Sequence, residues 1–124
     1  MFDVILYQPE IPPNTGNVMR LCANAGARLH LIEPLGFALE DRHLRRAGLD
    51  YREWVDVRVH PSLDACLAAA RPARLYACST RGHESYTHPN YTPGDAFLFG
   101  PETRGLPQAV LDACPVSQRI YLPI

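Results

Sequence analysis

The segment Phe97–Pro107 holds the residues best placed to do chemistry. An apolar Phe-Leu-Phe run ends there in two glycines, two prolines, a carboxylate, a hydroxyl and a guanidinium. The run is typical of a strand buried on both faces, Pro101 stops it, and Gly100 permits a close approach that a side chain would block. Ligands bind at the carboxyl ends of strands in open α/β sheets, so the segment indicates a ligand loop. The alternative is a plain turn with a Glu102–Arg104 pair.

A second candidate site follows from the spacing of Asn17, Arg20 and Asn24. Residues three and four apart lie on one side of a helix, so these two amides and one guanidinium form a row. The row borders the apolar stripe of a helix that we expect to begin near Thr15, with Asn14 as its cap. It could contact a polar ligand, or it could be an ordinary surface of the helix.

The charge pattern restricts how the protein can bind nucleic acid. The formal net charge is −1, and all 12 basic residues are arginine. Binding by overall positive charge is therefore excluded, and an RNA contact requires a local patch. Arg42, Arg45 and Arg46 fall on one side of a helix predicted to begin at Asp41, where they could hold phosphates or form a solvated face.

Several kinds of site lack their motifs in this sequence. Neither the G-x-G-x-x-G motif nor the P-loop motif occurs. A flavodoxin-like nucleotide-binding protein is a more distant alternative, but the sequence has no phosphate-binding loop to support it. The five histidines form no H-E-x-x-H motif and no pairing with the cysteines, so we expect no metal site. The four cysteines lie among apolar residues and predict buried, reduced thiols. No apolar run has the length of a membrane span and no signal peptide is evident, so the expected compartment is the cytoplasm.

The order of the expected strands and helices determines where the candidate residues lie in the fold. Expected strands and helices alternate, which predicts one domain over residues 1–124 with a mostly parallel sheet and helices on both faces. Residues 82–94 are expected to be irregular. The strands are expected at residues 4–7, 29–32, 55–59, 75–78, 97–99 and 119–122, and the helices at residues 15–25, 41–48, 61–70 and 108–113.

Three loops, beginning at Cys78, Gly100 and Leu122, each leave the end of a predicted strand. In a parallel sheet these loops lie on one edge. Glycine backbone and small side chains there could form a narrow slot that reads an adenine or a ribose.

Three segments, Pro12–Asn24, Arg45–Tyr51 and Phe99–Pro107, closely resemble those of the SPOUT-class RNA 2′-O-methyltransferases, specifically the tRNA (cytidine/uridine-34 2′-O)-methyltransferases. The resemblance runs through the whole chain in the same order. It implies an α/β knotted fold, S-adenosylmethionine as methyl donor, and a homodimer that methylates the tRNA wobble nucleotide. It does not follow from patterning alone.

The resemblance also implies roles for individual residues. Arg20 would act at the catalytic centre, and the resemblance favours RNA contact for Asn17. The charge pattern, and not the resemblance, makes Arg42, Arg45 and Arg46 the other candidates for RNA contact. The cofactor contacts would come from the three loops and comprise Cys78, Thr80, Gly100, Glu102, Gly105, Leu122 and Pro123.

The chain departs from the family at its end. The family continues past the strand that includes Ile120 with a segment that threads the knot, completes the cofactor pocket and supplies much of the dimer surface, whereas this sequence ends at Ile124. We therefore expect residues 1–124 alone to methylate weakly or not at all. The alternatives are a non-catalytic RNA-binding or assembly module of the same fold, and a ribosomal RNA 2′-O-methyltransferase.

Overall fold

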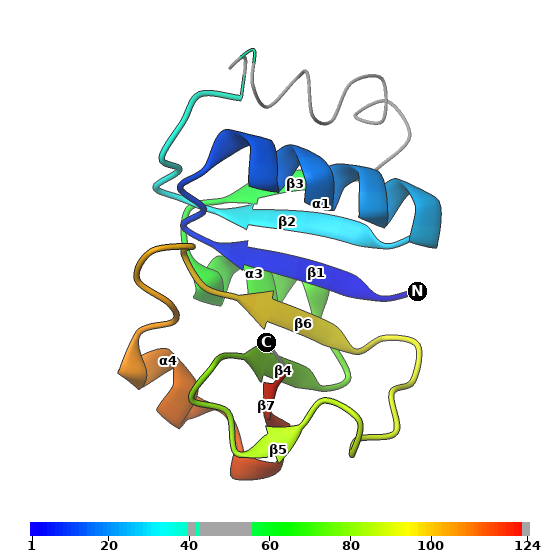
Figure 1. Cartoon of the computed structure of the whole chain (residues 1–124). Helices are drawn as coiled ribbons and strands as arrows, with labels where there is room; N and C mark the ends of the chain where they lie inside the picture. The colour runs from blue at the N-terminus through cyan, green and yellow to red at the C-terminus, as the bar shows by residue number, and fades with distance from the viewer. Residues whose placement is uncertain (40–41, 43–55, 123–124) are drawn as a thin grey trace.

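The protein folds around a seven-stranded sheet, in which every strand pairing is parallel (Figure 1). The computed structural model describes residues 1–39, 42 and 56–122. The order across the sheet is β3-β2-β1-β6-β4-β7-β5. The strands are β1 (Asp3–Tyr7), β2 (Arg28–Ile32), β3 (Val57–His60), β4 (Leu75–Cys78), β5 (Glu84–Ser85), β6 (Ala96–Phe99) and β7 (Arg119–Tyr121). The helices are α1 (Pro12–Ala25), α3 (Leu63–Ala70), α4 (Gln108–Ala113) and the 3-10 turn η2 (Val116–Gln118).

Helices cover both faces of this sheet, as predicted. Successive residues of a strand point to opposite faces, and β1 shows this clearly. Leu6 packs in a cluster with Met19 of α1, whereas Ile5 packs in another cluster with Cys66 of α3 and Leu111 of α4. Figure 1 shows α1 and α3 on opposite sides of the sheet. The expected α/β architecture is confirmed.

The start of α1 differs from the prediction. The helix begins at Pro12, three residues before Thr15, and its N-cap is Ile11, which makes no side-chain cap bond. Prolines are tolerated in the first helical turn because the N–H groups there have no partner within the helix. The expected cap by Asn14 is therefore wrong, and the prolines begin the helix instead of excluding it.

The apolar stripe predicted for this helix is only partly in the core. Met19 and Cys22 are buried, whereas Leu21 is 67% exposed. Leu21, Val18 and Ala25 instead line a cavity beside the helix. The stripe that hydrophobic spacing predicted, Val18, Leu21, Cys22 and Ala25, thus meets the core through Val18 and Cys22 and leaves Leu21 and Ala25 exposed.

The stretch 82–94 is not wholly irregular, because Glu84–Ser85 forms β5 and pairs with β7. A two-residue strand of polar side chains has no periodic pattern to reveal it. The four cysteines are free and buried, as expected. In the described parts of the chain, no helix has both the length and the apolar character needed to cross a membrane.

Candidate functional site

The parallel sheet brings the three predicted loops to one edge. Cys78, the last residue of β4, lies beside Phe99 of β6 and Ile120 of β7 in the strand registers. Gly100 and the segment from Tyr121 to Leu122 continue directly from those neighbours. The candidate cofactor residues from β4, β6 and β7 therefore share one edge, and we call this region the carboxyl edge.

The loop after β6 folds back tightly on itself. A Cβ atom at Gly100 would overlap the backbone of Gly105 and Leu106, so only glycine fits there. Gly105 has a φ of +70°, and no other atom lies within 4 Å of the position its Cβ would take. The first glycine thus closes the turn, and the second leaves open space beside the backbone.

The loop after β4 is tied to its neighbours on both sides. The Ser79 N–H donates to the Ile120 carbonyl at 3.0 Å, and a Cβ at Gly82 would overlap Ile120. Arg81 donates to the side chain of Gln108 at 2.6 Å and to the carbonyl of Leu106. The loops after β4 and β6 are therefore connected through one guanidinium.

Burial raises the pKa of Cys78 to about 12. At neutral pH its thiol is protonated, so Cys78 is neither a nucleophile nor a base. Cys78 therefore contributes to the carboxyl edge through its small side chain and its backbone groups, and not through thiol chemistry.

Two carboxylates join the carboxyl edge to the start of α1, an arrangement we call the glutamate clamp. Glu102 Oε2 accepts hydrogen bonds from the backbone N–H groups of Glu10 and Ile11, at 2.8 and 3.2 Å. In return, Glu10 Oε1 accepts from the backbone and hydroxyl of Thr103, at 2.9 and 2.7 Å. Arg104 adds an ion pair to Glu10 at 3.3 Å. The Glu102–Arg104 pair of the alternative interpretation is absent from the ion pairs of the described residues, and Arg104 pairs with Glu10 instead.

A cavity of about 490 Å³ extends from this clamp between α1, strand β1 and the end of β6. Its walls are mostly apolar, but Asn14, Thr15, Gly100 and Glu102 line it at the clamp end. The Thr15 side chain is fully buried, and its hydroxyl has no hydrogen-bond partner among the described residues. Buried polar groups are normally paired, so this hydroxyl is an exception in the wall of the cavity.

The remaining candidates lie outside this cavity. Asn17, Arg20 and Asn24 are exposed on α1, Arg42 is exposed, and Thr80 is exposed in the loop after β4. Arg45, Arg46 and Pro123 lie outside the described residues.

Glu10 and Arg81 are the site residues that sequence reasoning missed. Each acts through a partner distant in the chain, since Glu10 contacts Thr103 across 93 positions and Arg81 contacts Gln108 across 27. The sequence around Glu10 offers one local indication of a role, because this carboxylate lies between prolines directly after a buried strand.

Known proteins show where this arrangement belongs. The profile of the SpoU rRNA Methylase family matches residues 1–124. The chain belongs to that family. Among the relatives of this SpoU methylase, a tRNA (cytidine(34)-2′-O)-methyltransferase from Burkholderia ambifaria is 60% identical over 126 residues, which cover 100% of this chain and 81% of the relative.

Solved structures agree with this assignment. One that concerns 2-OH methylation of C/U34 on tRNA has a TM-score of 0.93 at 50% identity, and covers 100% of this SpoU methylase and 80% of that chain. The SpoU methyltransferase AviRb from Streptomyces viridochromogenes, in complex with AdoMet, has a TM-score of 0.81 at 24% identity over 98% of this chain and 50% of its own. At that identity AviRb shows a shared fold alone.

Proposed function

We propose that this SpoU methylase transfers a methyl group from S-adenosylmethionine to the ribose 2′-hydroxyl of nucleotide 34 in tRNA. The observation that carries the proposal is the 60% identity to a tRNA (cytidine(34)-2′-O)-methyltransferase across the whole chain. The convergence of three loops at one sheet edge supplies a compatible binding region.

The carboxyl edge is the region to which we assign the methyl donor. Gly105 leaves space beside its backbone, and the turn closed by Gly100 presents that backbone at the edge. We assign donor binding to this loop together with Cys78, Thr80, Leu122 and Pro123, while Glu102 holds the loop against α1. When bound, the donor supplies a sulfonium-linked methyl group with a good leaving group.

The protein must then align the ribose hydroxyl and allow its proton to leave. In-line attack forms the oxygen–methyl bond as the carbon–sulfur bond breaks, and the sulfur keeps the electron pair. Correct alignment of two reactants lowers a barrier by several kcal/mol, on the order of 7 or more in favourable cases. Arg20 is the proposed catalytic residue. Because a guanidinium is normally protonated, its main role in our proposal is to orient the hydroxyl and phosphate, with transient proton loss as the alternative.

The RNA contacts are proposed at Asn17, Arg42, Arg45 and Arg46, and the active form is proposed to be a homodimer in the cytoplasm. The exposed positions of Asn17 and Arg42 are compatible with RNA contact. Residues 1–124 would form one methyltransferase domain in this assembly.

Methyl transfer to total RNA, followed by mapping of the methylated nucleotide, tests the proposal. We expect the label at position 34 of tRNA, with at most a weak signal from residues 1–124 alone. Label in ribosomal RNA would instead favour a ribosomal RNA 2′-O-methyltransferase. If no RNA is labelled and the protein does not bind S-adenosylmethionine, a non-catalytic module is favoured. Arg20→Ala and Arg20→Lys should both lower turnover by at least about a hundredfold, the scale of one lost catalytic group. Near-normal turnover with tRNA binding retained would reject the role of Arg20.

A further inference from the structure

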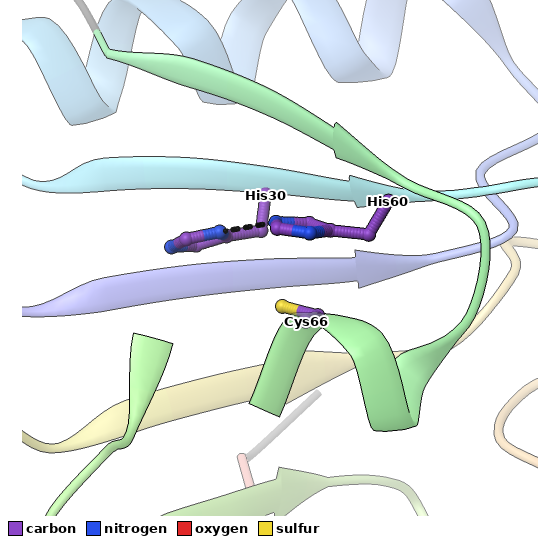
Figure 2. Close-up of side chains that lie close together, drawn as sticks. All are labelled: His30, His60 and Cys66. Carbon is purple, nitrogen blue, oxygen red and sulfur yellow. Dashed lines mark hydrogen bonds between the residues drawn. The ribbon is translucent and has the colours of Figure 1, made fainter. Parts of the chain in front are cut away.

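A buried cluster of metal-binding side chains lies away from the carboxyl-edge loops, on the face of the sheet that α3 covers. His30 of β2, His60 of β3 and Cys66 of α3 are 1%, 9% and 0% exposed. Figure 2 shows the two imidazole rings side by side, with the Cys66 sulfur facing them from the helix. Their candidate ligand atoms all lie within 4.8 Å of one another.

A carboxylate on the neighbouring strand orients the first of these rings. His30 Nε2 lies 2.8 Å from Asp3 Oδ1, and Arg28 pairs with both oxygens of Asp3. With its Nε2 hydrogen donated to the Asp3 carboxylate, His30 keeps an Nδ1 lone pair that faces His60 Nε2 at 2.9 Å. Metal-binding histidines are commonly oriented by a carboxylate in this way.

We propose that His30 Nδ1, His60 Nε2 and Cys66 Sγ form a binding site for a thiophilic transition-metal ion, with Zn²⁺ as the expected occupant. Two imidazoles and a thiolate are ligands that zinc accepts, and three protein ligands leave the fourth tetrahedral position to a small donor. The proposal does not depend on the methyltransferase function.

The distances require only a small adjustment. Zinc lies about 2.0 Å from nitrogen and about 2.3 Å from sulfur, so tetrahedral ligand atoms are roughly 3.3 to 3.8 Å apart. The His30 Nδ1 to His60 Nε2 distance is 2.9 Å and would widen by a few tenths of an ångström, about 0.4 Å. A nitrogen and a sulfur on tetrahedral zinc are about 3.5 Å apart. The three candidate ligand atoms lie within 4.8 Å of one another, so the sulfur would move in by about 1.3 Å at most.

Metal binding also has a defined proton balance. When His30 donates its Nε2 hydrogen to Asp3, the 2.9 Å contact between His30 Nδ1 and His60 Nε2 places a hydrogen on His60 Nε2 in the metal-free cluster. The metal takes the place of that proton, so neutral His60 carries its hydrogen on Nδ1 instead. Cys66 binds as thiolate and releases its thiol proton to solvent. The charges of the site are then one divalent cation, one thiolate, and the Asp3 carboxylate behind His30.

Cobalt(II) reports directly on this ligand set, because a cysteine ligand produces a thiolate-to-cobalt charge-transfer absorption. Metal-stripped protein titrated with Co²⁺ should take up one ion per chain and show that absorption, and Zn²⁺ should displace the cobalt. Cys66→Ala should lose the absorption. Cys22→Ala is the matched control, because Cys22 is likewise buried and free but lies on α1. This control should retain both binding and absorption.

A second variant covers the case in which Cys66→Ala fails to fold. His60→Gln keeps a hydrogen-bonding side chain beside His30, and it should weaken Zn²⁺ binding by more than about tenfold, the least that loss of a group supporting a metal site costs. Circular dichroism checks the fold of each variant. Charge-transfer absorption that persists in folded Cys66→Ala, or wild-type protein that binds neither ion, would overturn the proposal.

Discussion

At the scale of single residues, the two glycines of the β6–α4 loop have different functions. Gly100 is required because its neighbours occupy the space of a side chain, whereas Gly105 is required because of its backbone angle. A side chain that overlaps backbone atoms can be accommodated only if the backbone moves. An alanine in the left-handed backbone conformation, by contrast, loses only about 1 kcal/mol of stability. Substitution at the two positions should therefore have unequal effects.

Gly100→Ala should destabilise the protein by more than about 2 kcal/mol and abolish binding of S-adenosylmethionine. Gly105→Ala should cost about 1 kcal/mol and leave the fold intact, with weaker donor binding. Chemical denaturation measures the free energy of unfolding of each variant, and calorimetric titration with S-adenosylmethionine measures its affinity for the donor. Equal stabilities of the two variants would contradict this distinction.

At the scale of elements, the glutamate clamp joins the β1–α1 connection to the β6–α4 loop. Each carboxylate accepts from backbone groups of the other segment, so neither loop can move far without breaking bonds of both. Because α1 carries Arg20 and the second loop carries Gly105, the clamp sets the spacing between the proposed catalytic and donor-binding regions.

The clamp should weaken in acid. Hydrogen bonds from the backbone and hydroxyl of Thr103 lower the pKa of Glu10 below its ordinary value of 4.5. The folded state thus binds fewer protons at Glu10 than the unfolded chain, and the stabilisation is present above pH 4.5 and is lost as the pH falls below it. The difference in thermal midpoint between the protein and Glu10→Gln should be largest above pH 4.5 and shrink in acid. Glu33→Gln, in the exposed loop after β2, is the control and should show no such trend.

Local patterns predicted much of this element structure. The strand Leu75–Cys78 and the helix Gln108–Ala113 have the predicted bounds. An unbroken apolar run indicated the strand, and the residues after Pro107 indicated the helix. The meeting of the three loops followed from parallel topology. Long-range pairs could not be predicted in this way, since neither the glutamate clamp nor the cluster around His30 has a short sequence motif.

At the scale of the whole molecule, charge sets how RNA can be bound. A net charge of −1 gives no general attraction for a polyanion, so affinity must come from a few arginines on one surface. Each phosphate that the protein neutralises releases counterions from the RNA. The dependence of affinity on salt concentration therefore measures how many phosphates the protein contacts.

The slope of log affinity for tRNA against log salt concentration should therefore correspond to few contacts. Arg42→Ala should lower that slope by about 1, as expected for one lost phosphate contact. Arg58→Ala provides a control, because Arg58 is exposed on β3 but pairs with Asp56 at 3.0 Å. Filter binding at several salt concentrations measures both. An unchanged slope in Arg42→Ala would remove this residue from the RNA surface.

The place of β7 in the sheet has a consequence for how the protein is made. This strand is the last in the described chain, yet it lies between β4 and β5, and β5 has no other strand neighbour among the described residues. As the polypeptide leaves the ribosome, β1, β2, β3, β4 and β6 can assemble early, whereas β5 must wait for residues 119–121. The carboxyl edge therefore forms only after residues 119–121 have left the ribosome, and a shorter nascent chain lacks part of the surface that we propose for the methyl donor.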